Sequence, residues 1–156
     1  MHAFQQNAGA VLAARYASAG VDVTAGGTGD NTEVNGAWID RLGFNSIKVV
    51  ICYTATLAQA ATLSFAANLQ DASDGSGTGA ADFGDALAST AVSTGGTGGS
   101  TNTGVVELDF DVSGADRYVR IQFTPNLSAS GTDVAEMGAV YILAGGTSNP
   151  VTASLV

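Results

Sequence analysis

The sequence predicts an all-β domain, a jelly-roll-like antiparallel β-sandwich with an N-terminal arm and a long Gly-rich loop. Hydrophobic residues make up 46% of the 156 residues, which is enough to bury a core. Val, Ile, Thr, Phe and Tyr occur in short runs, and clusters of Gly, Ser, Thr and Asp separate these runs. The 21 glycines do not recur at every third position, which excludes a collagen-like chain. We therefore expect an arm over residues 1–20 and one sandwich domain over residues 21–156.

The first 20 residues are interpreted as an arm. The segment from Ala8 to Ala19 is rich in alanine, so it could form a short helix or lie extended on a neighbouring subunit. The N-terminus lacks the basic region of a signal peptide, and Arg15 and Tyr16 interrupt its only apolar stretch. We therefore expect the protein to be made in a host cytoplasm and not exported by that route.

Three segments have the apolar pattern of buried strands. Ser46 to Thr56 is apolar on both faces, so we expect it in the middle of a sheet, with Cys52 buried. Thr62 to Gln70 alternates apolar and more polar residues. Glu136 to Ala144 is apolar on both faces and is again expected to be central.

Residues 105–112 and 117–123 are predicted to pair as a hairpin across a short turn. Each segment alternates apolar and polar side chains, and a slip of one residue would expose every apolar one. The resulting register places Asp109 opposite Arg120, a cross-strand pair expected to contribute about 0.2–1 kcal/mol. Pro125 is expected to end the second strand.

Residues 72–104 form a low-complexity segment rich in Gly, Ser and Thr, which we expect to be a long loop. Structureless loops of this length are uncommon in compact domains and are usually functional. We expect the loop to lie across the body of the domain or across a neighbouring subunit. The candidate contact residues within it are Gly95, Gly96, Gly98 and Gly99.

The charge balance restricts the partners. Five Lys and Arg residues against 14 Asp and Glu residues give a formal net charge of −9. Such a surface cannot neutralise phosphates, so neither nucleic acid nor an anionic membrane is an expected partner. No apolar run reaches the roughly 18 residues that a membrane-spanning helix requires. The single cysteine excludes a disulfide within the chain.

Two pairs of acidic residues are candidates for a metal-binding or catalytic site. Asp71 and Asp74 precede Gly75 and form a weak calcium candidate, but the third acidic position and the bidentate Glu of a calcium loop are missing. A turn is the favoured interpretation. Asp82 and Asp85 could suggest acid–base chemistry, but no continuous apolar sequence surrounds them that would shift a pKa, so we interpret them as solvated.

The sequence offers no set of residues for catalysis. His2 and Cys52 are the only histidine and the only cysteine, and they cannot by themselves form a zinc site. A Ser-His-Asp arrangement would also depend on His2, which lies in the arm. We therefore expect no enzymatic activity, no metal and no cofactor.

Aromatic residues are the remaining candidates for recognition. Trp38 could stack on a ligand, but its position beside Ile39 favours a core or interface anchor. The segment 117–121 resembles a strand common in jelly-roll carbohydrate-binding modules, although its alternation already accounts for its residues. The candidate contact residues are therefore the four loop glycines and four aromatic residues. The aromatic residues are Phe4, Tyr16, Trp38 and Phe44.

Several stretches together resemble a family of tailed-phage virion proteins. They are Ala37-Trp38-Ile39-Asp40-Arg41-Leu42-Gly43-Phe44-Asn45-Ser46, Leu69-Gln70-Asp71-Ala72-Ser73-Asp74-Gly75, Arg117-Tyr118-Val119-Arg120-Ile121-Gln122-Phe123-Thr124-Pro125 and Asn126-Leu127-Ser128-Ala129-Ser130-Gly131-Thr132-Asp133. The resemblance covers roughly residues 35–150 and implies a virion structural role. It brings no catalytic residues.

The resemblance implies a head decoration (cement) protein on the outer capsid surface, with the major capsid protein as its partner. We expect a homo-oligomer and favour a trimer, since identical subunits usually form closed rings. Two alternatives remain at this stage. One is a carbohydrate-binding or host-adhesion module on the virion, and the other is a tail or head–tail joining protein.

Overall fold

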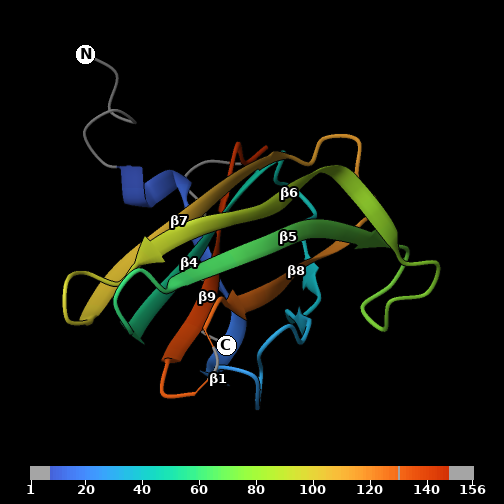
Figure 1. Cartoon of the computed structure of the whole chain (residues 1–156). Coiled ribbons are helices and arrows are strands. Elements are labelled where there is room, and N and C mark those ends of the chain that lie inside the picture. The colour runs from blue at the N-terminus through green and yellow to red at the C-terminus, as the bar shows by residue number, and fades with distance from the viewer. Residues whose placement is uncertain (1–7, 130, 148–156) are drawn as a thin grey trace.

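The computed structural model describes residues 8–129 and 131–147, which form two antiparallel sheets packed face to face (Figure 1). The predicted all-β sandwich is therefore confirmed. The elements are η1 (Ala8–Val11), β1 (Ala13–Thr24), β2 (Val34–Asn35), β3 (Ile39–Asp40), β4 (Ser46–Leu57), β5 (Thr62–Ala72), β6 (Ala81–Thr94), β7 (Ser100–Asp111), β8 (Tyr118–Leu127) and β9 (Val134–Ala144). Sheet A has the order β1-β9-β4-β7. Sheet B has the order β2-β8-β5-β6, and β3 also pairs with β8.

The strands pair as one long hairpin rolled into a sandwich. Strand β1 pairs with β9, and β2 and β3 together pair with β8. Further inward along the hairpin, β4 pairs with β7 and β5 pairs with β6. Pairing of β4 with β9 and of β5 with β8 joins these pairs into two sheets. This is the jelly-roll arrangement, which viral capsid and lectin domains share, so it does not by itself indicate a function.

The core lies between the sheets and is formed by the strands with the strongest apolar patterns. Strands β4 and β9 are central in sheet A, and β5 buries its alternate residues, as predicted for all three segments. The Phe65 ring lies 6.2 Å from the Tyr53 ring of the opposite sheet and 6.3 Å from the Phe123 ring, measured between centroids. Aromatic contacts of this kind each contribute about 0.5–1.5 kcal/mol beyond burial.

The expected N-terminal arm is in part a strand. Residues 13–24 form β1, the edge strand of sheet A, and Ala17 and Val23 are buried in the core. Register shifts occur between Tyr16 and Ser18 and between Ser18 and Val21. Irregularities of this kind break the two-residue period, so the strand has no alternating pattern in its sequence.

The predicted hairpin of residues 105–112 and 117–123 is wrong. Strand β7 pairs with β4 in sheet A, whereas β8 pairs with β5 in sheet B. Asp109 consequently pairs with Lys48, at 2.8 Å, and not with Arg120. The alternation in both segments identifies the side chains that face the core. It does not identify the neighbouring strand, because the two segments face one core from opposite sheets.

The expected loop of residues 72–104 also differs from the structure. It contains β6, a strand of 14 residues at the edge of sheet B, and it includes the start of β7. Most β6 side chains are exposed, on both faces of the strand. The strand therefore needs no regular apolar residues, and these are the signal by which a strand is predicted from sequence. The irregular parts are shorter, at 73–80 and 95–99.

Pro125 does not end its strand, because β8 continues to Leu127 and pairs Pro125 with Phe65. The Pro125 carbonyl points away from β5 and accepts a hydrogen bond from the Asn31 amide at 2.9 Å. In an antiparallel ladder the N–H and C=O of one residue point to the same side. An N–H at residue 125 would therefore point away from β5, toward the side where β2 does not extend past Phe123. Its absence costs the pairing of β8 with β5 no hydrogen bond.

Candidate protein-binding face

The predicted contact residues do not lie together in the structure. Tyr16 is 63% exposed on the outer face of sheet A, whereas Trp38 is half-buried beside sheet B. Phe44 packs against the core. Phe4 lies outside the described residues. The turn between β6 and β7 holds the four glycines Gly95, Gly96, Gly98 and Gly99.

Apolar side chains occupy the middle of the outer face of sheet A, the side that faces away from the core. Cross-strand pairing places them in two adjacent rows: Tyr16, Val140 and Val50 in one, and Gly138, Cys52 and Val105 in the next. Val105 is 55% exposed, close to the exposure of Tyr16. The outward face of an antiparallel sheet is ordinarily polar, so this apolar centre is a feature that requires an explanation.

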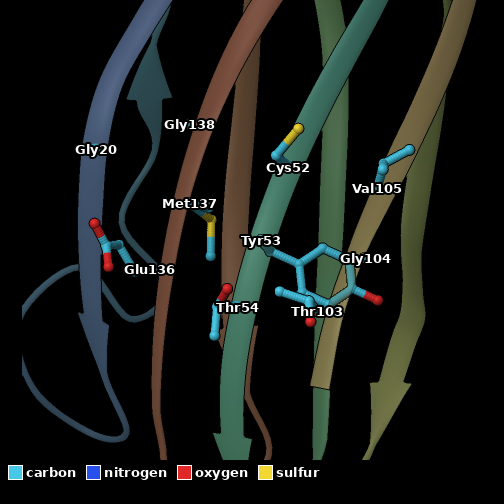
Figure 2. A pocket seen from close by; sticks show the side chains of 10 residues that line it. All are labelled: Gly20, Cys52, Tyr53, Thr54, Thr103, Gly104, Val105, Glu136, Met137 and Gly138. Atoms are coloured by element: carbon cyan, nitrogen blue, oxygen red, sulfur yellow. The ribbon is translucent and has the colours of Figure 1, made fainter. Parts of the chain in front are cut away.

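A depression runs across this face, and two of the residues that line it are glycines, which have no side chain to fill it. Figure 2 shows Gly20 on β1 and Gly138 on β9, next to Cys52 on β4 and Val105 on β7. The depression has a volume of about 630 Å³. A second depression of about 450 Å³ shares Thr54 and Glu136 with it and continues to Thr56 and Val134, and we call the two together the outer groove.

Two carboxylates, Asp22 and Glu136, line the outer groove. Asp22 and Glu136 lie directly opposite each other on β1 and β9, and like charges in that position repel. Among the described residues, neither has a basic side chain within 4.0 Å. Further along the same face, beyond the groove, Lys48 bridges Glu107 at 2.9 Å and Asp109 at 2.8 Å. The hydrogen bonds that Lys48 donates to Asp109 and Glu107 raise its pKa, so this cation is already engaged.

Cys52 is exposed, and the prediction that it is buried is wrong. The prediction rested on the apolar residues at both faces of β4. Only one face of β4 packs against sheet B, and Cys52 lies on the other, beside the outer groove (Figure 2). The thiol is therefore a chemical handle at the centre of the candidate face.

Sequence reasoning missed Val105, Glu136 and Gly138 as candidate contact residues. The signal for them was present, since β4 and β9 are apolar on both faces. We interpreted that pattern as a sign that both strands are central in a sheet, which is correct. The same pattern also indicates that the outward face of the sheet is apolar. Only the register shows that these residues and Tyr16 form one surface.

The outer face of sheet B is different, because polar side chains there bond to one another. Asp82 accepts hydrogen bonds from Asn68 and Gln70, each at 2.9 Å. The guanidinium of Arg120 donates two to the Gln70 side chain, at 2.9 and 3.0 Å. Gln122 donates to Glu33 and Asn35, at 2.8 and 2.7 Å. This polar network satisfies its own donors and acceptors, so the face does not require a partner.

Trp38 belongs to the same network, and Arg120 covers one face of its ring. The guanidinium carbon of Arg120 lies 4.6 Å from the centre of the Trp38 ring, a cation–π contact. Gly77 fits against the edge of the indole, where an added Cβ would lie 2.9 Å from Nε1. A ligand that stacks on the face covered by Arg120 would have to displace its guanidinium.

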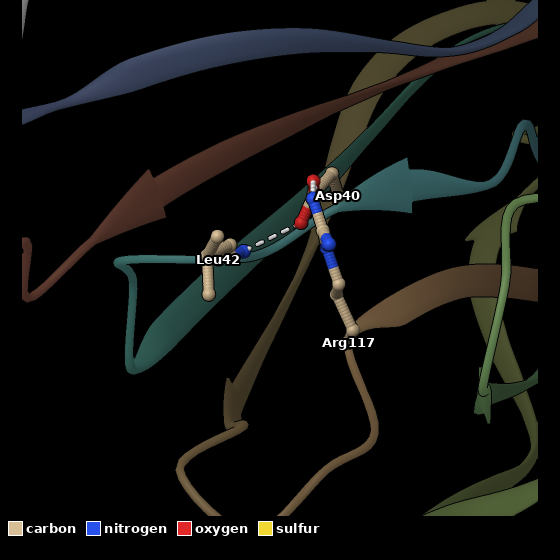
Figure 3. Close-up of polar contacts among 3 residues, drawn as sticks. All are labelled: Asp40, Leu42 and Arg117. Carbon is tan, nitrogen blue, oxygen red and sulfur yellow. Dashed lines mark hydrogen bonds and ion pairs between the residues drawn. The ribbon is translucent and has the colours of Figure 1, made fainter.

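Three of the four stretches that resemble phage virion proteins, 37–46, 69–75 and 117–125, approach one another at one end of the sandwich. Arg117 donates to the Asp40 carboxylate at 2.6 and 3.0 Å, and Asp40 also accepts from the Leu42 amide (Figure 3). The hydrogen bond from Arg117 holds the pKa of Asp40 below its usual range. The Arg41 guanidinium binds the carbonyls of Ala115 and Asp116. These residues fasten β3 to the start of β8.

The two weak calcium candidates are engaged in turn hydrogen bonds. Asp71 accepts from the Asp116 amide at 2.8 Å. Asp74 accepts from the Ser76 and Thr78 amides at 2.9 and 3.1 Å, and hydrogen bonds from Thr78 lower its pKa. Among the described residues, no group of three or more His, Cys, Asp or Glu side chains could hold a metal ion. No helix within 8–129 and 131–147 is long and apolar enough to cross a membrane.

No protein-family model and no curated protein match this sequence. Among solved structures, the chain is similar to infectious bursal disease virus of the Gx and Gt strains, at 12% and 15% identity and a TM-score of 0.46 for each. The match covers 89% of this chain but only 33% of each of those chains, so this chain spans about a third of their length. The virus-like particle of the prawn Macrobrachium rosenbergii extra small virus matches at 9% identity and a TM-score of 0.22. Likeness at this level carries no argument about function.

Proposed function

We propose that this protein is a structural component of a virus particle, a decoration (cement) protein on the outer surface of an assembled phage head. The observation that carries the proposal is the exposed apolar centre of sheet A, with Tyr16 and Val105 each more than half exposed. Soluble monomers seldom expose large contiguous apolar patches unless these bind another molecule. The stretches that resemble phage virion proteins support the choice of partner, the major capsid protein.

Binding alone can stabilise a capsid. A protein that binds the assembled lattice but not free or unfolded capsid subunits shifts the equilibrium toward the lattice. Each site occupied at a free concentration of 100 times Kd contributes about 2.7 kcal/mol. The net charge of −9 supports a position on the outer surface, away from packaged DNA. The protein acts in this way without a catalytic step.

A homo-trimer is part of the proposal, since three identical subunits suit a local threefold axis of an icosahedral lattice. Light scattering of the purified protein and of the particle-bound form measures the subunit number. A protein that stays monomeric both in solution and on the head would contradict the trimer but not the binding role.

The proposed function is tested by stripping the protein from heads and heating the heads with and without it. We expect stripped heads to release their DNA at a lower temperature, and re-addition of the protein to restore the release temperature. An unchanged release temperature would contradict cementing. Copies per particle distinguish this role from the tail and head–tail joining alternative, because a decoration protein is present in hundreds of copies and a joining protein in a handful.

Glycan binding remains the second candidate, because the polar network on sheet B has the amides and the guanidinium with which proteins recognise sugars. It receives less support, since Arg120 covers one face of Trp38 and the network bonds to itself. A glycan array tests this candidate, and specific binding that is lost in Trp38→Ala would favour host adhesion over decoration.

A further inference from the structure

We propose that the outer groove of sheet A binds a segment of the partner protein that inserts a lysine or arginine side chain between apolar ones. This inference rests on the proposed function and specifies the face that is used and the chemistry of the occupant. It also orients the protein, with sheet A on the capsid and sheet B facing solvent.

The shape of the groove favours an inserted side chain. Gly20 and Gly138 line a depression of about 630 Å³ on the outward face of the sheet, and an added Cβ at Gly138 would meet only backbone atoms at 3.8 Å or more. Cys52 and Val105 provide apolar walls. The aliphatic stem of a lysine or arginine can pack on such walls while its charged end extends further.

The charge of the groove favours a basic occupant. Glu136 lines the groove and lies opposite Asp22, and among the described residues no cation compensates either carboxylate. A guanidinium or ammonium placed between them would relieve their repulsion and gain two attractive interactions. Lys48 cannot do so in this chain, because it is bonded to Glu107 and Asp109.

The same charges argue against a second copy of this chain as the occupant. A two-fold contact between two sheet A faces would bring the carboxylates of Asp22, Glu136 and Glu107 of one copy close to those of the other. The partner surface is therefore basic where it meets Glu136 and Asp22 and apolar where it meets Tyr16 and Val105. This complementarity also predicts that binding weakens with added salt, since screening reduces such attractions.

The contrast between the two sheets gives the orientation. Sheet A has an apolar outer face with uncompensated carboxylates, whereas the side chains on the outer face of sheet B satisfy one another. Docking through sheet B would remove water from its polar side chains and would offer them no new hydrogen bonds in return, which is unfavourable. Docking through sheet A covers apolar surface and leaves the polar face in water.

The single exposed cysteine allows a direct test of which face is covered. The rate at which a maleimide reacts with Cys52 is measured for the free protein and for the protein bound to heads of the same virus. We expect binding to slow the reaction at least tenfold. As a matched control, a Cys52→Ser protein with Ser89→Cys places the thiol on β6 of sheet B, where the rate should stay within twofold.

Substitutions in the groove give a second, independent readout. Gly138→Val fills the groove, and Glu136→Gln removes one of the two facing carboxylates. We expect each to weaken binding to stripped heads at least tenfold, with a thermal unfolding midpoint of the free protein no lower than that of the wild type. Asp85→Asn, which removes an exposed carboxylate on β6, should bind heads as the wild type does.

The outcomes separate this inference from the proposed function. If the protein binds and stabilises heads while Cys52 keeps its full reactivity, the decoration role stands and the outer groove is wrong as the contact. If Glu136→Gln binds as tightly as the wild type at every salt concentration, the basic occupant is wrong. If the wild-type protein does not bind heads, both the function and the inference are overturned.

Discussion

Tyr141 illustrates how one side chain completes a sheet where the backbone leaves a gap. Strand β2 ends at Asn35 and β3 begins at Ile39, so β8 has no strand partner between them. The buried Tyr141 hydroxyl accepts a hydrogen bond from the Ile121 amide at 2.9 Å and donates one to the Ala37 carbonyl at 3.1 Å. Gly36 is required beside it, because an added Cβ would lie 2.6 Å from this hydroxyl.

Removal of this hydroxyl should be costly. In Tyr141→Phe the Ile121 amide loses its acceptor in a buried position, so we expect the free energy of unfolding to fall by about 1–3 kcal/mol. Urea denaturation measures the difference. Tyr16→Phe is the control, since the ring of Tyr16 is largely exposed, and it should leave the midpoint unchanged. Equal effects of the two substitutions would show that the bridging role is wrong.

Tyr141 also predicts a loss of stability in alkali. Burial raises the pKa of its phenol above the usual value, which is about 10 in an unfolded chain. The folded state thus retains the proton at pH values where the unfolded state releases it, so the contribution of Tyr141 to stability is constant below about pH 10 and falls above it. The stability advantage of the wild type over Tyr141→Phe should therefore shrink from about pH 10 upward. Urea midpoints of both proteins between pH 8 and 11 test this, and a constant difference would contradict it.

Among the elements, the turn of residues 95–99 closes one end of the sandwich and is the part of the expected loop that remains irregular. The Gly95 amide donates to the Ala61 carbonyl at 2.8 Å, and the Ala60 amide donates to the Gly95 carbonyl at 2.9 Å. The buried Asp133 carboxylate holds the neighbouring Ala58 amide through Oδ1 at 2.8 Å. Gly95 therefore has a structural task, whatever its part in binding.

Two adjacent glycines in this turn should respond differently to substitution. An added Cβ at Gly95 would lie 1.9 Å from the Ala58 carbonyl oxygen, whereas at Gly96 the nearest atom is 3.8 Å away. We expect Gly95→Ala to destabilise the fold by about 1–3 kcal/mol, the range for overpacked sites, and Gly96→Ala to change it by less than about 0.5 kcal/mol. Thermal unfolding measures both, and a neutral Gly95→Ala would contradict the close approach.

The attachment of β3 to β8 should depend on pH through Asp40. Its pKa is lowered, chiefly by the hydrogen bond from Arg117, so the ion pair contributes stability above about pH 4 and loses it as the pH falls through the lowered pKa. Asp40→Asn should be slightly less stable than the wild type at pH 7, since exposed ion pairs contribute little, and the difference should shrink as the pH falls to 2. Denaturation midpoints at the two pH values test this, and a difference that is undiminished at pH 2 would contradict it.

For the whole molecule, charge and apolar surface are distributed so that the two faces of the sandwich have different tasks. Lys48 lies on the outer face of sheet A, where two carboxylates already bind it. Arg117 and Arg120 are engaged by Asp40 and Gln70. These cationic side chains are therefore already bonded within the chain. The electrostatic potential around the molecule is consequently negative.

We accordingly predict that the protein does not bind DNA. A net charge of −9 repels the phosphate backbone, which supplies most non-specific affinity. Fluorescence anisotropy of a labelled duplex at about 0.1 M salt should show no binding up to a protein concentration on the order of 0.1 mM, the weak end of ordinary non-specific affinity. Saturable binding at micromolar concentration would contradict both this prediction and the outer position on the head.

The sequence by itself determined the all-β class, the central position of β4 and β9, and the core-facing side of the strands that alternate, namely β5, β7 and β8. It did so because burial on one face imposes a two-residue period, which is a local property. Only the tertiary structure decided which strands are neighbours, since β7 and β8 have compatible patterns and yet lie in different sheets. The candidate face depends on that decision. Tyr16, Gly138 and Val105 lie far apart along the chain, and only the register across four strands makes them one surface.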